Sequence, residues 1–416
     1  MISAPSDFLS SMSASKVFMH IKLEFYDSQM NYIDEFTKYL TTDDLGFLSI
    51  DKNRPIRRSF SLTFDNSDNI FDFGDDKLVW LDKRMKLYIG LENRNKEVIY
   101  IPQGVYLISE PMQQHTPQGK IVTINAIDKM ALFTDKRGKF VNNYTIEEGV
   151  LITDAIKAIA SQGQFGVAET LFNFDELEDK DEDFTYTDAD GLIHKRNYAR
   201  VPYELTFEGT DNRYNALEEL AKLANCTIFY DEYGYLRLRK IDINDMMNSS
   251  SVWTFYYGDD NERYYAGTVR TLSEESIANH IRVLAGSSET ASYFYDLEVN
   301  ETEPLWEGNP YSVQRIGRYS YFHNNGSPDP VLLTLEDCIN RAKYELMNRL
   351  GYTERVQLTL SPHFLLDTGD IIEIEDVNSG VTGRYLIESI SMPLTPQMMT
   401  IEAKKENLVI SDWDFI

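Results

Sequence analysis

The sequence is poor in cysteine and in positive charge. It has two cysteines, Cys226 and Cys338, far apart in the chain, with no CxxC motif and no clustered histidine. This excludes a disulfide framework and the usual structural zinc sites. Against 40 Lys and Arg stand 67 Asp and Glu, a net charge of −27. Because sequence-independent binding to nucleic acid depends on positive charge, we expect no specific nucleic-acid binding, although an acidic wall would let DNA slide past without sticking.

Long apolar runs and targeting signals are also missing. No stretch approaches the roughly 18 apolar residues that span a membrane. Residues 1–15 are rich in serine and lack the basic and apolar regions of a signal peptide. We therefore expect no stable membrane insertion. We expect the chain to assemble in the cytoplasm.

The motifs of common enzymes do not occur: the sequence has no GxSxG, HExxH, P-loop or GxGxxG. With 67 acids, any two carboxylates could be nominated as a glycosidase pair, so their abundance carries no signal. His363 follows Pro362 in an expected loop and is better interpreted as an ordinary histidine than as a general base. We expect no enzyme, and no catalytic, cofactor-binding or metal-binding residues.

The strongest charge run is residues 173–190, with nine acids and one lysine. Residues 188–191 (DADG) match half of a calcium loop. However, Tyr186 stands where the first ligand belongs, and no Glu follows at the required distance. A solvated loop is the better interpretation.

The chain has 416 residues, of which 42% are hydrophobic and 26% charged, a composition typical of a globular protein with several domains. Apolar residues alternate with polar ones over residues 16–25, 56–64, 84–91, 104–110 and 121–128. Period-two patterns of this kind, without a long helix between them, predict a β-barrel or sandwich.

Helical spacing begins after residue 145. We predict one helix over residues 154–161 and a second that is capped by Asp211 or Asn212 and followed by a hairpin with its turn at residues 231–234. Residues 287–333 contain four prolines and are expected to be irregular.

A third helix is predicted to start at Thr334, with Asp337 completing a capping box. Its apolar stripe is expected to pack on the protein's own sheet, and Gly351 is expected to end it. The stripe consists of Ile339, Ala342, Leu346 and Leu350.

An internal echo is the most informative feature of the sequence. Residues 104–126 (GVYLISEPMQQHTPQGKIVTINA) match residues 383–403 (GRYLIESISMPLTPQMMTIEA) in Gly-x-Tyr-Leu-Ile and in Thr-Pro-Gln at one common offset. A fainter echo relates HIKL at 20–23 to HIRV at 280–283. Two unrelated hairpins with similar turns remain the alternative. If the echo is real, the chain carries two copies of one β domain, and three chains would supply six similar domains around an axis.

The order of segments resembles the baseplate or tail-tip hub proteins of long-tailed bacteriophages, which are related to the spike hubs of contractile injection systems. The resemblance rests on VWLDKRMKLYIGL, PQGVYLISEP and IVTINAIDKMALF, on the helix and hairpin NALEELAKLANCTIFYDEYGYLRLRK, and on LDTGDIIEIED followed by GRYLIESISMPLTPQMMTIEA. It covers most of residues 16–405.

This resemblance implies a mainly β chain with an α+β insertion, in which two tail-tube-like β-barrels flank a small α/β domain. We expect an N-terminal arm (1–15), a first barrel (16–135), an α/β domain (136–245) with the acidic loop 173–190, a second barrel (246–405) with an insertion at about 287–333 and a helix at 334–351, and a C-terminal tail (406–416). No room is left for the cell-wall-cutting extension of some relatives.

By the same resemblance, the chain would be a virion protein. It would form a homotrimeric, pseudo-six-fold ring that lines the DNA channel and joins the tail tube, or a distal tail protein, to a spike, fibre or tail lysin subunit. The tape measure protein is a further candidate partner. One rival is a receptor- or carbohydrate-binding adhesin, which would stack sugars on Trp306, Trp413 or the tyrosine-rich residues 256–265. A cell-wall hydrolase is the other.

Overall fold

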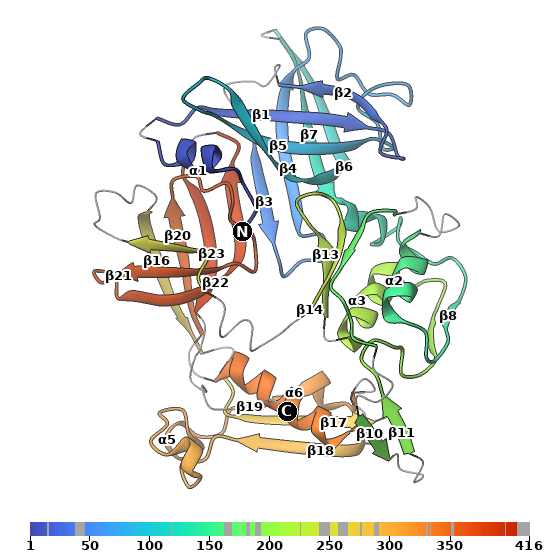
Figure 1. The fold of residues 1–416 in the computed structure, drawn as a ribbon, viewed down its shortest axis with the longest axis vertical. Coiled ribbons are helices and arrows are strands. Elements are labelled where there is room, and N and C mark those ends of the chain that lie inside the picture. Colours follow the sequence, from blue (N-terminus) through green and yellow to red (C-terminus); the bar gives the residue numbers. More distant parts are fainter. Residues whose placement is uncertain are drawn as a thin grey trace. The chain divides into compact units, whose positions relative to one another are not determined.

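The computed structural model describes residues 1–14, 16–37, 46–117, 119–161, 169–179, 184–187, 193–224, 226–240, 250–256, 265–274, 277–286, 291–329, 332, 334–350, 353–395 and 397–405. It divides into two compact units. Unit 1 comprises Met1–Leu177, Ala199–Thr268 and Gln357–Ala403. Unit 2 comprises Glu178–Tyr198, Val269–Val356 and the residues from Lys404 on. The chain is mainly β with helices between the strands, as predicted (Figure 1).

Antiparallel strands from the first third of the chain form one part of a large sheet in unit 1, in the order β3-β4-β7-β6-β5-β1-β2. They are β1 (Met19–Tyr26), β2 (Tyr32–Phe36), β3 (Phe47–Asp51), β4 (Arg58–Asp65), β5 (Arg84–Glu92), β6 (Val98–Thr116) and β7 (Gly119–Asp128). The predicted alternation places one face of each strand in the core. In β1 and β4, the buried residues on that face include Ile21, Leu23, Phe25, Phe60, Leu62 and Phe64.

Strands from the last third of the chain continue the same sheet, in the order β16-β20-β23-β22, with β21 between β22 and β15. They are β15 (Trp253–Tyr256), β16 (Tyr265–Ser273), β20 (Thr353–Leu360), β21 (Ile371–Asp376), β22 (Val381–Pro393) and β23 (Met399–Lys405). The boundary between the two units falls within β16, within β20 and within β23.

The middle of the chain adds the predicted α/β elements to unit 1. They are the short helix η1 (Lys129–Leu132), β8 (Tyr144–Ile146), α2 (Ile152–Ser161), β9 (Phe172–Phe174), β12 (Leu205–Phe207), α3 (Arg213–Leu223), β13 (Cys226–Tyr230) and β14 (Leu236–Lys240). α3 begins after Asn212, as predicted, but the Asn212 side chain makes no capping hydrogen bond. The predicted β13–β14 turn is held by Asp231, which accepts the backbone N–H groups of Tyr233 (3.0 Å) and Tyr235 (2.8 Å).

Residues 1–15, predicted only as an arm, contain the helix α1 (Ser6–Met12). Phe8 and Met12 of this helix are buried, and so is Ile2, whose N–H donates to the carbonyl of Leu365 (2.7 Å). The start of the chain is thus packed into unit 1.

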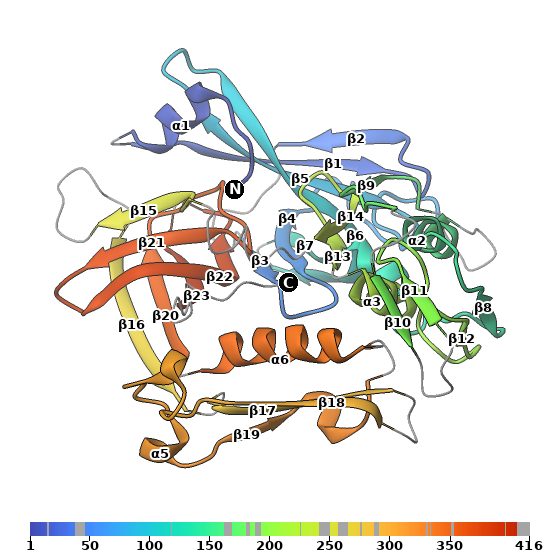
Figure 2. The same cartoon turned by 60° about the horizontal axis from the view of Figure 1, so that its bottom comes forward.

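Unit 2 is a three-stranded sheet covered by a helix (Figure 2). Its elements are the hairpin β10 (Phe184–Thr187) and β11 (Ile193–Arg196), then β17 (His280–Gly286), β18 (Ala291–Glu298), η3 (Pro304–Trp306), α5 (Val313–Ile316), β19 (Ser320–Phe322), η4 (His323–Gly326) and α6 (Leu335–Arg349). α6 starts at the predicted capping box: Asp337 N–H donates to Thr334 Oγ1 (3.0 Å), and Thr334 N–H donates to Asp337 Oδ2 (3.1 Å). Ala342, Leu346 and Leu350 of its stripe are buried in the core of the unit. Gly351 lies outside the described residues.

Two predictions about this region are wrong. Residues 287–333 are not irregular throughout, because they contain the eight-residue strand β18, in which Tyr293, Tyr295 and Leu297 alternate toward the core. The faint echo of residues 20–23 in residues 280–283 does not mark equivalent positions. β1 lies in the large sheet of unit 1, whereas β17 lies between β18 and β19 in unit 2.

Candidate functional site

The two segments that echo each other in sequence form hairpins with the same backbone feature. φ is +134° at Gly104 in β6 and +107° at Gly383 in β22. Side chains other than glycine rarely adopt such values. Two residues further on, Tyr106 and Tyr385 are both fully buried. The repeat in the sequence is therefore also a repeat in the structure.

The likeness extends to the neighbouring strands. The order β3-β4-β7-β6-β5 in the first part of the sheet corresponds to β16-β20-β23-β22-β21 in the second. Further matched residues are buried in pairs: Ile108 with Ile387, Ile124 with Ile401, and Ala126 with Ala403. The correspondence stops at the next strand, because β1 runs antiparallel to β5 whereas β15 runs parallel to β21.

Strand β22 joins the two copies. Its first part pairs with β21, and residues 389–393 pair antiparallel with β3. Ile390 lies opposite Ile50, and Met392 lies opposite Leu48. All four side chains are buried. A strand of the first copy thus completes the sheet edge of the second.

The matching part of β6 has a different environment. Residues 110–115 pair with β7 on one side, while the pairing of β6 with β5 on the other side ends at Leu107. Among the residues that the structure describes, no strand pairs with this second edge. Residues 112–115 are exposed, and Met112 retains 56% of its accessible surface. An exposed strand edge of this kind is a template for pairing with another strand.

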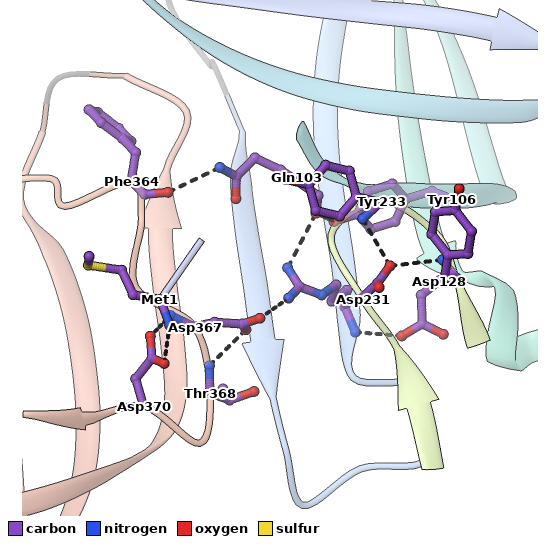
Figure 3. Close-up of polar contacts among 12 residues, drawn as sticks. Met1, Gln103, Tyr106, Asp128, Asp231, Tyr233, Phe364, Asp367, Thr368 and Asp370 are labelled. Carbon is purple, nitrogen blue, oxygen red and sulfur yellow. Dashed lines mark hydrogen bonds and ion pairs between the residues drawn. The ribbon is translucent and has the colours of Figure 1, made fainter. Parts of the chain in front are cut away.

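A buried polar cluster connects the two copies close to this junction (Figure 3). Its centre is Arg58 of β4, which is 2% exposed. The Arg58 guanidinium forms an ion pair with Asp367 of the C-terminal part of the chain. The backbone N–H of Arg58 donates to Asp128 Oδ2 at 2.8 Å.

Hydrogen bonds extend the cluster on both sides of Arg58. The Gln103 amide donates to the carbonyl of Phe364 (3.1 Å), and the Tyr106 hydroxyl donates to the carbonyl of Gln103 (2.7 Å). The N–H of Asp367 donates to Asp370 Oδ2 at 2.8 Å, and the amino group of Met1 forms an ion pair with Asp370.

The electrostatics of the cluster are those of a structural joint. Burial disfavours the charge on Arg58, but Asp367, together with Tyr106, Glu232 and Asp128, outweighs it and raises the pKa of the guanidinium above its ordinary value. Burial raises the pKa of Asp128 to about 6, although the N–H groups of Arg58 and Met130 bind the carboxylate. A buried charge of this kind is stable only with its partner, so Arg58 and Asp367 hold the two copies in one arrangement.

Sequence analysis missed both Arg58 and β3. The sequence does indicate that Arg58 is buried. It lies on the same face of its strand as the buried residues Phe60, Leu62 and Phe64. A lone arginine on a buried face indicates a distant acid. β3 is short, and nothing local indicates that its partner is β22.

Two residues considered for other functions, His363 and Trp306, are buried, whereas Tyr256 of the tyrosine-rich residues is 38% exposed. His363 is fully buried, its ring centroid lies 4.6 Å from that of Trp253, and burial lowers its pKa to about 4. It is therefore neutral near pH 7 and out of reach of a substrate. Trp306, considered as a sugar-stacking residue, is 2% exposed in the core of unit 2, which corrects that expectation.

Hydrogen bonds hold two residues of the acidic segment 173–190 in place. Asp175 accepts hydrogen bonds from Arg237 Nη2 and from the N–H of Lys240, both at 3.1 Å. Asp179 accepts one from Asn197 (2.8 Å). The calcium-loop candidate at 188–191, Trp413 and most of the tyrosine-rich residues 256–265 lie outside the described residues, as does the tail 406–416.

The described part of the chain has neither a metal-binding cluster nor a membrane-spanning helix. It contains no group of three or more His, Cys, Asp or Glu side chains arranged to bind a metal ion. None of its helices is long and apolar enough to cross a membrane. Cys226 and Cys338 are both free and buried.

Solved structures with a similar fold include proteins that are described as tail proteins, two of them from prophages. The chain is similar to the tail protein from Neisseria meningitidis MC58 (TM-score 0.56, 11% identity, 93% of this chain and 97% of the other). It is also similar to the 43 kDa tail protein of prophage MuSo2 from Shewanella oneidensis (0.56, 12%, 93% and 98%). A third is the prophage tail protein gp18 from Listeria monocytogenes (0.52, 11%, 94% and 96%).

The sequence itself matches no protein-family model and none of the curated proteins. The similarity is therefore one of fold, at identities where sequence comparison finds nothing. The resemblance to phage tail proteins that the sequence predicts is confirmed at this level: the chain has the fold of phage and prophage tail proteins.

Proposed function

We propose that this chain is a structural component of a phage or phage-like tail, and specifically a baseplate or tail-tip hub. Three copies would form a ring in which the two β domains of each chain alternate. The single observation that carries this proposal is the structural repeat around Gly104–Tyr106 and Gly383–Tyr385. Two similar β domains per chain are what a three-chain ring needs to present six similar positions to a six-fold partner.

The fold likeness supports the tail assignment. The similar proteins are described as tail proteins, and the match covers nearly their whole length. The charge supports a channel for DNA, because a net charge of −27 disfavours binding to phosphate backbones. The Arg58–Asp367 ion pair supports a rigid hub.

By this proposal, the partners are a tail tube or distal tail protein on one side and a spike, fibre or tail lysin subunit on the other. The tape measure protein is a further candidate. The segments 173–190 and 287–333 are proposed to contact these neighbours, because loops on a rigid scaffold usually carry the variable contacts. The chain would act in the virion and would not be an enzyme.

The adhesin and hydrolase alternatives gain no support from the described residues. Trp306, the tryptophan of the described residues that the adhesin alternative named for stacking, is buried. The hydrolase requires an accessible acid–base pair, and His363 is inaccessible.

Light scattering on the purified chain tests the proposal. Three copies of the 48.1 kDa chain have a mass of about 144 kDa, which is the expected result. The measurement is repeated with the tail-tube and spike proteins encoded in the same genome. A stable dimer or tetramer would contradict the proposal, and so would a chain that stays monomeric in both runs.

A further inference from the structure

The two copies of the repeated hairpin differ in whether their second strand edge is covered. In β22, residues 389–393 receive β3 in antiparallel pairing, with Ser391 opposite Ser49. In β6, the corresponding residues 110–114 pair with β7 only, within the described part of the chain. The same strand edge is therefore paired with another strand in β22 and unpaired in β6.

The pairing of β22 with β3 identifies the kind of strand that fits the edge of β6. β3 is the strand next to β4, which is the strand next to β7 of the first hairpin. The strand in the same position of the second copy is β16, since it lies next to β20, which lies next to β23. β16 ends the strand order of the large sheet.

We propose that residues 110–115 of β6 pair antiparallel with β16 of a second copy of this chain, as residues 389–393 pair with β3 within one chain. The inference rests on the proposed ring and names the strands that close it. Within a chain, a strand of the first copy covers the second. Between chains, a strand of the second copy covers the first copy of the next chain. The contact is head-to-tail, and such contacts generate rings when the rotation closes.

The exposed side chains fit this role. Val269 and Leu272 of β16 retain 58% and 52% of their accessible surface, and Met112 of β6 retains 56%. Large apolar side chains on an edge strand favour association with another strand. On β22, Ser391 stands in the position of Met112 and stays exposed beside β3, whereas its neighbours Ile390 and Met392 are buried.

Charge also fits, in a chain that is otherwise strongly acidic. Residues 110–115 carry one charged residue, Glu110, and β16 carries one, Arg270. The two segments carry no like charges, and Arg270 already pairs with Glu354 of its own chain (2.9 Å). Pro111 does not exclude pairing, because β22 accepts β3 up to Pro393.

Disulfide cross-linking tests the contact directly. Met112→Cys is combined in one chain with a cysteine at each position from 267 to 272 in turn, and the protein is oxidised mildly. Because side chains of a strand alternate between faces, cross-links are expected at positions of one parity only. They should move the band from 48.1 kDa to two and three times that mass, reversibly on reduction. Met112→Cys with Val377→Cys is the control, since Val377 is 84% exposed and lies outside both segments.

A second variant separates this contact from the ring as a whole. Val269→Glu changes an exposed side chain, so the chain should keep its secondary structure by circular dichroism while the trimer is lost. Val377→Glu is the matched control and should keep the trimer. A trimer that persists in Val269→Glu and gives no interchain cross-link would overturn the inference but leave the proposed ring standing. A wild-type chain that stays monomeric and gives no interchain cross-link would contradict both.

Discussion

Gly104 and Gly383 occupy the same position in two hairpins that lie 279 residues apart, and each lies two residues before a fully buried tyrosine. The backbone at both glycines has a positive φ, of +134° and +107°. A β-carbon at Gly104 would lie 2.8 Å from the ring of Tyr106. The glycine thus makes room for the tyrosine that packs beneath it.

We predict that Gly104→Ala destabilises the chain by about 2–4 kcal/mol. Strain from the positive φ accounts for about 1–2 kcal/mol and overpacking for the rest. Tyr106 cannot easily yield, because its hydroxyl donates to the carbonyl of Gln103 and its ring is buried. Urea unfolding of wild type and variant measures the difference.

Gly119→Ala is the matched control for this prediction. Gly119 also has a positive φ (+152°), but a β-carbon there would have no heavy atom within 4 Å. It should lose only the strain contribution. Equal losses in the two variants would show that contact with Tyr106 plays no part.

The ion pair between Arg58 and Asp367 predicts a second effect on stability. Asp367→Asn leaves the guanidinium of Arg58 buried without its charged partner, which is expected to cost about 3 kcal/mol. Lys222→Gln breaks the exposed pair with Glu218 (3.1 Å) and should cost about 0.5 kcal/mol or less. Similar losses for both variants in urea unfolding would contradict the role of Arg58 as a joint.

Unit 2 is predicted to depend on pH through His323. Its Nε2 lies 2.7 Å from Asp329 Oδ2, and its Nδ1 lies 3.4 Å from Glu345 Oε1. Burial and Arg341 disfavour the charged ring, but the bonds to Asp329 and Glu345 prevail and raise its pKa. Burial likewise disfavours the charge on Glu345, yet His323 and Arg349 lower the pKa of that carboxyl.

The signs of these shifts define a pH window. A raised histidine pKa stabilises the fold below about pH 6.5, and this contribution is lost as pH rises through the folded pKa. A lowered glutamate pKa stabilises the fold above about pH 4.5, and this contribution is lost as pH falls. His323→Gln should therefore cost more stability at pH 5.5 than at pH 8, measured by urea unfolding. An equal cost at both values would refute the assignment.

The two cysteines are predicted to be unreactive in the folded chain. Burial raises the pKa of Cys226 to about 11 and that of Cys338 to about 12, so neither forms a thiolate at pH 8. A thiol reagent should label neither in native protein and both in denaturant. Met112→Cys should gain one reactive thiol in the native state. Rapid labelling of native wild type would be the opposite result, and it would require the native cysteines to be replaced before cross-linking.

Local patterns were sufficient for the elements that bury one face. The alternation in β4 and the capping box of α6 depend on residues within a few positions of one another, and the structure has both where the sequence indicates them. The repeat around Gly104 and Gly383 was visible because the turn and the buried tyrosine constrain the residue type directly.

Long-range pairing could not be predicted in the same way. The pairing of β3 with β22 joins residues more than three hundred positions apart, and nothing in the five residues of β3 specifies that partner. β18 was missed because the four prolines that follow it led to the interpretation of the whole segment as irregular. The echo in β17 misled because a short β-strand motif does not determine the sheet in which it lies.

The most direct test of the account is the symmetry of the assembled ring in electron-microscope projections of the purified oligomer. The account predicts three-fold symmetry with six similar lobes around a central opening, formed by the two β domains of each of three chains. A two-fold or four-fold particle would contradict it, as would a three-fold particle in which the two β domains of each chain lie at different radii.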